Sequence, residues 1–352
     1  MPLLRSGKGV ASEREHVHVL IDVFLAAGAA DRLRAMPQVH VSMVETPEEH
    51  RRALPEELIR NVEVLFCTHP PANFEEMKRL KLIQIASAGY AQLMGLGLAE
   101  RGVRACNSRG VFDVPIAEWN MAMMVSLARN LRGMIRNQES RIWDRSAVFQ
   151  AEIRGLTAGI WGYGGIGRET ARLAKAFGMK VHVMSRGPVR PRRDVYVVPG
   201  TSDTEGVLPD RQFIEGQELE FLSGLDFLIL AVPLTKQTDG LIGEQQLRAL
   251  PRTCFVLNPA RGPIIQEQAL VKALKEGWIA GAALDTHYHY PMPADHPLWQ
   301  FPNVIFTPHI SGSSLSPHFS ERIWEIFLNN LERYMNGRPL LNELAERQLR
   351  GA

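Results

Sequence analysis

Residues 156–167 have the sequence Leu156-Thr-Ala-Gly-Ile-Trp-Gly162-Tyr-Gly164-Gly165-Ile166-Gly167. The apolar run predicts a buried strand, and the residues that follow Gly167 predict a helix. Gly162 allows a tight turn, Gly164 lets a backbone approach a diphosphate, and Gly167 lets the helix pack closely against the strand. The helix N-terminus offers free N–H groups to phosphate. Because Val181-His-Val-Met184 predicts the next strand, the segment predicts a dinucleotide-binding unit.

Length and composition favour an ordinary globular protein of two domains. The chain has 352 residues, of which 45% are hydrophobic and 22% are charged. Its formal net charge of +2 indicates neither a nucleic-acid partner nor a polyanionic one. The three cysteines, Cys67, Cys106 and Cys254, have no metal-finger spacing and predict buried free thiols.

No segment predicts a membrane span or a signal peptide. The longest apolar stretch, residues 221–234, contains Asp226 and Pro233 and is too short to cross a bilayer. Residues 1–15 are charged and predict a loose tail. We therefore expect a cytoplasmic protein with no membrane partner.

Alternating strand and helix patterns along the chain predict an α/β fold with parallel sheets. Residues 116–131 predict a nearly all-apolar helix, residues 74–80 a helical stretch, and residues 320–336 an amphipathic helix. Residues 187–216 are rich in Pro, Gly, Arg and Asp and predict a long loop. The predicted strands are 17–21, 39–44, 62–66, 82–85, 226–232, 253–257, 280–284 and 303–306.

Several motifs together resemble one family, the D-isomer-specific 2-hydroxyacid dehydrogenases, which include glyoxylate/hydroxypyruvate reductases and formate dehydrogenases. The resemblance covers residues 60–340. Besides the glycine segment, it is carried by Ala231-Val-Pro-Leu-Thr235 with Thr238, Asn258-Pro-Ala-Arg261-Gly262, Ala283-Leu-Asp285, Pro293-Ala-Asp-His-Pro-Leu-Trp299 and Thr307-Pro-His309-Ile-Ser-Gly312.

The resemblance implies two Rossmann-like, doubly wound parallel-sheet domains with a cleft between them. Residues 116–311 would form the dinucleotide-binding domain. Residues 1–115 would form the substrate-binding domain, completed by residues 312–352. The family is commonly dimeric through the apolar 116–131 helix, so we expect a homodimer.

The same resemblance assigns the chemistry of hydride transfer to a small 2-oxoacid. Arg261 would hold the carboxylate and carbonyl, since its planar fork suits both groups. His309 would be the acid/base. Asp285 would help to hold the nicotinamide end of the cofactor. Substrate would also contact Ala88, Gly89 and Asn107.

The family pattern implies a set of cofactor-binding positions along the second domain. They are Gly162, Gly164, Gly165, Ile166, Gly167, Ser185, Arg186, Val232, Pro233, Thr238, Asn258, Ala260, Asp285, His309 and Gly312.

The end of the second strand departs from an NAD-type site, which has Asp or Glu there. This chain has Met184-Ser185-Arg186, and Arg190, Arg192 and Arg193 precede the first acid, Asp194. A hydroxyl and arginines attract a 2′-phosphate that a carboxylate would repel. The sequence therefore predicts a preference for NADP, with NAD possible.

A second departure concerns the partner of His309. Relatives usually have Glu before the Pro-x-Pro, and the carboxylate raises the pKa of the histidine. Here Tyr290 precedes Pro291-Met292-Pro293. We count Tyr290 among the catalytic residues and expect the pKa of His309 to be lower than in the relatives that have Glu. The alternative partner of His309 is His287 or His289, which lie in the same segment.

Three functions remain open at this point. The leading one is NADP-dependent reduction of a 2-oxoacid to a D-2-hydroxyacid. Oxidation of formate needs no proton transfer, so the neutral Tyr290 favours it as an alternative. A non-catalytic dinucleotide sensor is the third. No metal is expected, because the pair His287 and His289 has no third ligand at suitable spacing.

Overall fold

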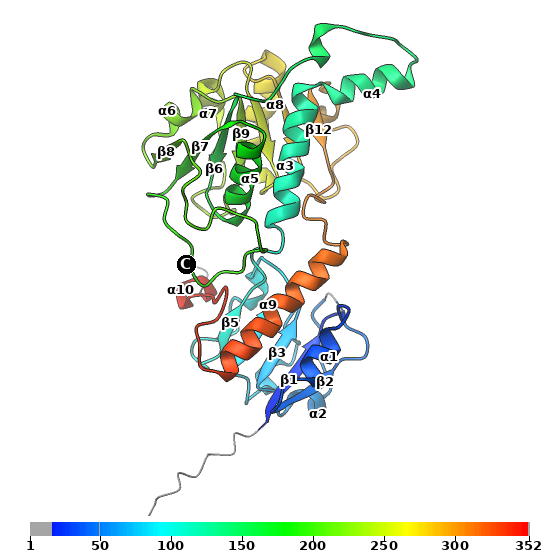
Figure 1. The fold of residues 1–352 in the computed structure, drawn as a ribbon. Coiled ribbons are helices and arrows are strands. Elements are labelled where there is room, and N and C mark those ends of the chain that lie inside the picture. The colour runs from blue at the N-terminus through cyan, green and yellow to red at the C-terminus, as the bar shows by residue number, and fades with distance from the viewer. Residues whose placement is uncertain (1–15, 49, 351–352) are drawn as a thin grey trace, which may run out of the picture. The chain divides into compact units, whose positions relative to one another are not determined.

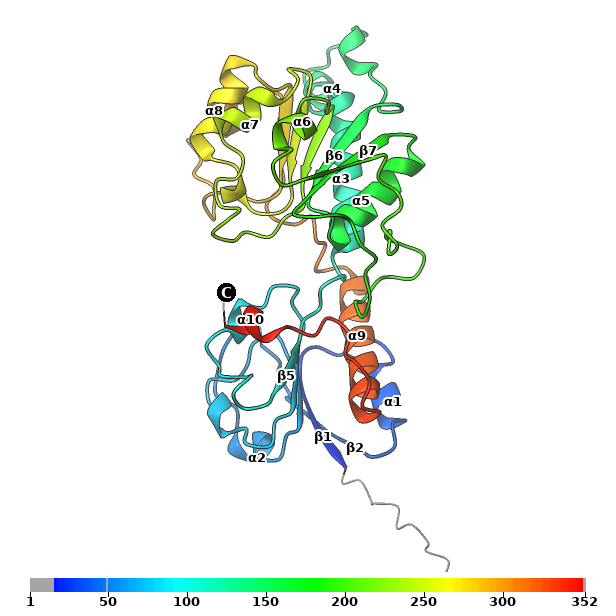
Figure 2. The same ribbon diagram turned by 90° about the vertical axis from the view of Figure 1, so that its left-hand side faces the viewer.

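The computed structural model describes residues 16–48 and 50–350. The predicted tail at residues 1–15 lies outside them. The chain divides into two compact units, of which one comprises Met1–Ser108 with Ser320–Ala352 and the other Arg109–Phe319. Both units consist of parallel strands and helices (Figures 1 and 2), as the α/β prediction requires.

The first unit contains a five-stranded parallel sheet in the order β2-β1-β3-β4-β5. Its strands are β1 Val17–Asp22, β2 Val39–Met43, β3 Val64–Cys67, β4 Leu82–Ile85 and β5 Arg104–Cys106. Its helices are α1 Ala29–Arg34, α2 Glu56–Ile59, α9 Pro317–Met335 and α10 Glu346–Leu349, with short 3-10 turns at Phe74–Glu76 and Ala91–Leu93.

Helix α9 supplies much of the core of this unit. Phe66 of β3 stacks on Phe327 with ring centroids 4.4 Å apart, and Trp324 packs edge-on against Phe66 at 5.2 Å. Asn330 of α9 donates to the buried Gln84 of β4 at 2.8 Å. The C-terminal segment is thereby bound to the sheet that the N-terminal residues form.

The second unit contains a seven-stranded parallel sheet in the order β12-β11-β10-β9-β6-β7-β8. Its strands are β6 Thr157–Trp161, β7 Lys180–Ser185, β8 Arg211–Ile214, β9 Phe227–Leu230, β10 Phe255–Asn258, β11 Gly281–Leu284 and β12 Val304–Phe306. Its helices are α3 Asp113–Ala128, α4 Leu131–Glu139, α5 Gly165–Ala176, α6 Glu218–Leu222, α7 Glu244–Ala249 and α8 Glu267–Glu276, with 3-10 turns at Ala147–Phe149, Gly262–Ile264 and Pro297–Gln300.

Helices cover both faces of the larger sheet (Figure 2). Helices α3 and α5 pack together on one face, and α6, α7 and α8 lie on the other. Because all connections are parallel crossovers, the loops after the strands gather at the carboxyl edge, where ligands of such sheets bind. None of the helices between residues 16 and 350 is long and apolar enough to cross a membrane.

The structure corrects several expectations about local elements. The loop predicted over residues 187–216 contains the edge strand β8, and the short β5 was not predicted. The helical stretch predicted at 74–80 is only the 3-10 turn Phe74–Glu76. The helix predicted over 116–131 ends at Ala128, because Asn130 adopts a left-handed φ of 46° and its side chain caps α4 instead. The three cysteines are buried and unpaired, as predicted.

Candidate active site

The glycine segment forms the turn between β6 and α5. Gly162 has a φ of 101°, and a Cβ at this position would lie 2.5 Å from the carbonyl oxygen of Ala231. A Cβ on Gly167 would collide with the carbonyl of Gly162, which explains the close packing of α5 against the strand end. Gly164 is exposed and precedes the free N–H groups of α5. These features fit a diphosphate at the helix N-terminus.

Asp113 lies against this turn and was not singled out in the sequence. It is the first residue of α3, and its carboxylate occupies the space that a side chain on Gly165 would need. Gly165 is therefore required for the packing of α3 on α5. The only sequence signal for this contact is the acidic residue that opens the α3 helix.

Strand β7 ends without a carboxylate at the position where an NAD-type site has Asp or Glu. The hydroxyl of Ser185 donates to the carbonyl of Gly187 at 2.7 Å, and Arg186 is exposed. Within the described chain, the Arg186 side chain forms no ion pair. The predicted arginines differ in their surroundings, since Arg193 is paired with Glu205 at 2.7 Å and Arg192 is partly buried with Nη1 unpartnered.

The segment after β7 is held against the glycine turn by Arg168 of α5. Its guanidinium donates to the carbonyls of Tyr163, Asp203 and Arg190. The hydroxyl of Tyr163 donates to the Asp203 carboxylate at 2.7 Å. The arginine-rich segment therefore has a defined position beside the turn, which its composition alone did not indicate.

Arg261 follows β10 in a turn that Asn258 builds. The Asn258 amide donates to the carbonyl of Arg261 at 2.9 Å and accepts from the N–H of Ala260 at 3.1 Å. Arg261 is exposed, and only its Nη1 is used, in a 2.6 Å bond to the Ala260 carbonyl. A Cβ on Gly262 would lie 2.5 Å from the carbonyl of His287, so the turn lies against the segment that follows β11.

Two further predicted positions, Thr238 and Gly312, shape loops at the same edge. The hydroxyl of Thr238 donates to the carbonyl of Pro233 at 2.6 Å in the loop that follows β9 and contains Val232. A Cβ on Gly312 would lie 3.0 Å from the ring of Phe112.

Asp285 anchors the loop that carries His309. Its buried carboxylate accepts hydrogen bonds from the Thr307 hydroxyl and the Ile310 N–H through Oδ1, and from the N–H and hydroxyl of Ser311 through Oδ2. The N–H of His309 donates to the Asp285 carbonyl at 2.8 Å. These bonds hold His309 at a left-handed φ of 57°, a conformation uncommon outside glycine.

His309 and Tyr290 are brought together as the sequence predicted. Tyr290 Oη lies 3.1 Å from His309 Nδ1 and also accepts the backbone N–H of His287 at 3.2 Å. A phenol can donate to an unprotonated Nδ1 or accept from a protonated one, so it holds the ring without favouring its charged form. The alternative partner His287 faces elsewhere, since its Nε2 lies 2.8 Å from the Thr307 carbonyl.

The surroundings lower the pKa of His309 below its ordinary value. Burial is the largest cause, and the positive charge of Arg261 adds to it, with His287 contributing in the same direction. Asp285 opposes the shift by raising the pKa. The guanidinium of Arg261 therefore acts electrostatically on the His309 imidazole.

The predicted substrate loop of the first unit is built within that unit. The Asn107 amide donates to the carbonyl of Ala88 at 2.7 Å, and the Ser87 hydroxyl donates to the carbonyl of Gly89 at 2.7 Å. Asn107 is buried and Gly89 is exposed. Asn107 therefore braces the loop of Ala88 and Gly89, which was predicted to contact the substrate.

Known proteins share this fold and sequence pattern. The family model described as D-isomer specific 2-hydroxyacid dehydrogenase, NAD binding domain, matches residues 121–311. A glyoxylate reductase from Thermofilum pendens is 32% identical over 293 residues, which cover 80% of this chain and 82% of the relative. A D-isomer specific 2-hydroxyacid dehydrogenase family protein from Aeromonas salmonicida matches with a TM-score of 0.72 and 26% identity, covering 94% of this chain and 99% of the other.

A second solved structure was determined with a cofactor bound. It is the D-isomer specific 2-hydroxyacid dehydrogenase from Xanthobacter autotrophicus in complex with NADPH and MES, with a TM-score of 0.72 and 25% identity over 95% of this chain and 99% of that chain. Fold, site and relatives define a nicotinamide-dependent oxidoreductase that acts on a 2-hydroxyacid or 2-oxoacid. The chain belongs to the D-isomer specific 2-hydroxyacid dehydrogenase family.

Proposed function

We propose that this enzyme is an NADPH-preferring reductase of a small 2-oxoacid such as glyoxylate. Residues of the unit Arg109–Phe319 would hold the dinucleotide, and Ala88, Gly89 and Asn107 would contact the substrate. The observation that carries the proposal is the His309 imidazole, which Tyr290 orients at 3.1 Å and on which the charge of Arg261 acts, because 2-oxoacid reduction needs a proton donor and a carboxylate-binding cation together. The cytoplasmic location stays a prediction from the sequence.

The bound nicotinamide supplies the hydride that reduces the carbonyl carbon. The protein residues supply orientation and a proton. The Arg261 guanidinium has donors free to hold the carboxylate beside the ketone. Protonated His309 gives its Nε2 proton to the developing alkoxide, while Nδ1 stays bonded to Tyr290 Oη.

Initial rates test this assignment. NADPH and NADH oxidation would be followed with glyoxylate, hydroxypyruvate, pyruvate and phenylpyruvate between pH 5 and 9. We expect turnover with a preference for NADPH. If no 2-oxoacid reacts while NADPH still binds, the proposal of a reductase is wrong.

A formate-type oxidation is the second candidate, since Tyr290 is neutral and the pKa of His309 is lowered. Hydride removal from formate releases carbon dioxide and needs no proton donor. Formate-dependent reduction of NAD⁺ or NADP⁺, unaffected by pH around neutrality, would favour it over the reductase.

Replacing Tyr290 with Glu is expected to extend reduction to higher pH. Reduction requires the imidazolium, so activity is full below the pKa of His309 and falls as pH rises through it. A carboxylate beside Nδ1 favours the charged ring and should move this fall upward by about one pH unit or more. The measurement is kcat against pH. Tyr290→Phe keeps the position neutral, so kcat should fall at nearly the same pH as in the unchanged enzyme. If kcat of Y290E also falls at the same pH, the residue at position 290 does not set the pKa of His309.

The preference for NADPH is expected to depend on Ser185 and Arg186. Arg186→Ala should raise the KM for NADPH about tenfold, because an unpaired guanidinium is available to the 2′-phosphate, and leave the KM for NADH nearly unchanged. Ser185→Asp should reverse the preference through charge repulsion. Arg193→Ala is the matched control, since Glu205 already neutralises Arg193. Equal effects of R186A on both cofactors would contradict the NADPH assignment.

We also propose a homodimer formed through the region of α3 and α4. The residues that support it are apolar and exposed on α4 and in the loop that follows, where Trp143 is 90% exposed. They are Leu131, Ile135, Ile142, Trp143 and Val148. Sedimentation velocity at micromolar concentration would detect the dimer.

A further inference from the structure

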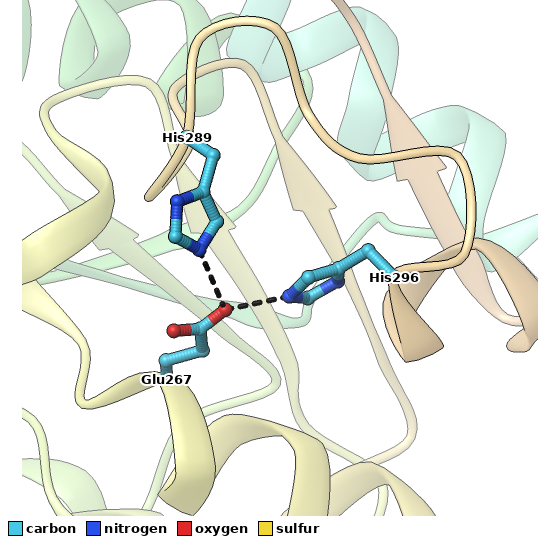
Figure 3. A group of neighbouring side chains, drawn as sticks. All are labelled: Glu267, His289 and His296. Atoms are coloured by element: carbon cyan, nitrogen blue, oxygen red, sulfur yellow. Dashed lines mark hydrogen bonds and ion pairs between the residues drawn. The ribbon is translucent and has the colours of Figure 1, made fainter.

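A cluster of two histidines and a glutamate lies in the second unit, outside the group formed by Arg261, Tyr290 and His309. Glu267 is the first residue of α8, His289 lies in the segment after β11, and His296 precedes the 3-10 turn Pro297–Gln300. Figure 3 shows both imidazoles directed at the same carboxylate. The sequence places His289 beside His287 and shows no third ligand at suitable spacing. The structure instead turns His287 toward Thr307 and brings Glu267 and His296 to His289.

We propose that Glu267, His289 and His296 form a binding site for a divalent transition-metal ion such as Zn²⁺. The proposal does not depend on the reductase activity. Two imidazole nitrogens and one carboxylate oxygen are a donor set that suits Zn²⁺ and its neighbours and leaves a position for water. The three ligand atoms all lie within 4.8 Å of one another.

The distances around the carboxylate are within about 1 Å of those that a bound ion requires. Glu267 Oε1 lies 2.6 Å from His296 Nε2 and 3.8 Å from His289 Nε2. Ligands about 2.0–2.2 Å from a tetrahedral ion lie about 3.3–3.6 Å apart. The Glu267–His296 distance must therefore widen by about 0.7–1.0 Å, and the Glu267–His289 distance must shorten by about 0.2–0.5 Å. A rotation of the 33% exposed Glu267 side chain can supply the first change, and the 53% exposed His289 side chain can supply the second.

The ion would replace the proton that Glu267 and His296 now share. His296 Nδ1 accepts the N–H of Leu298 at 3.3 Å, a long bond that has to open, because an imidazole that binds metal through Nε2 carries its proton on Nδ1. The ammonium group of the nearby Lys272 forms an ion pair with the Glu244 carboxylate at 2.8 Å, so it does not neutralise Glu267. Glu267 and His296 also line an open pocket of about 470 Å³, so the ion and its water have access from solvent.

Titration calorimetry of the full chain with Zn²⁺, in a buffer that does not chelate metals, tests the site. We expect one ion per chain. His289→Ala and Glu267→Gln should each weaken binding at least about tenfold, since even the loss of a residue that only supports a ligand costs this much. Because His289 is exposed, H289A should fold normally, and its unfolding transition without metal should match that of the unchanged protein.

Two control variants make the assignment specific. His50→Ala removes an exposed histidine that lies 2.7 Å from Glu48 without a second imidazole, so Zn²⁺ affinity should not change. His309→Asn removes the histidine of the candidate active site and should also leave it unchanged. Cobalt(II) provides a second readout, because visible absorption of a low-symmetry His/Glu site should appear in the unchanged protein and disappear in H289A. Undetectable binding at 100 µM Zn²⁺, or equal affinity in H289A and E267Q, would overturn the proposal.

Discussion

His309→Asn is expected to lower kcat for 2-oxoacid reduction by about 10²- to 10⁴-fold, the usual contribution of a general acid. Asparagine is chosen because position 309 has a φ of 57°, which asparagine tolerates better than most residues. The loop should therefore keep its bonds to Asp285. Single-turnover rates with NADPH give the chemical step, and fluorescence titration gives cofactor affinity, which should change little.

The same variant separates the two candidate activities. Reduction of a 2-oxoacid needs a proton at the alkoxide, whereas oxidation of formate does not. A loss in reduction of less than tenfold would mean that His309 is not the acid. Retention of formate oxidation in H309N, together with absent 2-oxoacid reduction in the unchanged enzyme, would favour the second candidate.

Arg261→Met is expected to lower kcat/KM for the 2-oxoacid by about 10²- to 10⁴-fold. Two hydrogen bonds from a guanidinium to a charged substrate contribute about 1.5–3 kcal/mol each, and methionine makes neither. Arg261→Lys keeps the charge but loses the planar fork, so an intermediate loss should follow. Steady-state rates over a range of substrate concentrations measure both variants.

Arg261→Met should also change the pH profile. The guanidinium lowers the pKa of His309, so its removal raises this pKa and moves the fall in kcat to higher pH. Arg252→Met, at an exposed arginine of the same unit, is the control and should change neither quantity. A fall in kcat/KM without a change in the pH profile would mean that Arg261 does not act on His309.

The sequence predicted the elements whose signals are local. The apolar run before Gly162 corresponds to β6, and the expected strand at 181–184 corresponds to β7 with one residue more at each end. Strand β8 was missed because it lies at the sheet edge and only Phe213 of its four residues is buried, so no apolar run marks it. The three-residue β5 is too short to produce a pattern.

The sequence also singled out Arg261, His309 and Tyr290, since each lies in a short motif of fixed spacing, and it predicted the contact between Tyr290 and His309. It did not predict the hydrogen bonds that hold the loop of His309. Asp285 was expected to contact the cofactor, yet both of its carboxylate oxygens accept hydrogen bonds from the loop that carries His309. Whether it also contacts the nicotinamide stays a prediction. No pattern in the chain signals that a carboxylate will accept the N–H groups of residues 25 or 26 positions away.

The sequence predicts local elements but not most of the contacts between them, because those contacts depend on the register of the parallel strands. Side-chain type and strand propensity are properties of neighbouring residues, so the chain carries them before it folds. The pairing of Asn258 with Leu284, and of Leu284 with Phe306, is what places the ends of β10, β11 and β12 side by side. Arg261, Tyr290 and His309 come together there, as do Glu267, His289 and His296 nearby. These contacts depend on hydrogen bonds between strands that are distant in sequence, so they form only when the sheet has formed.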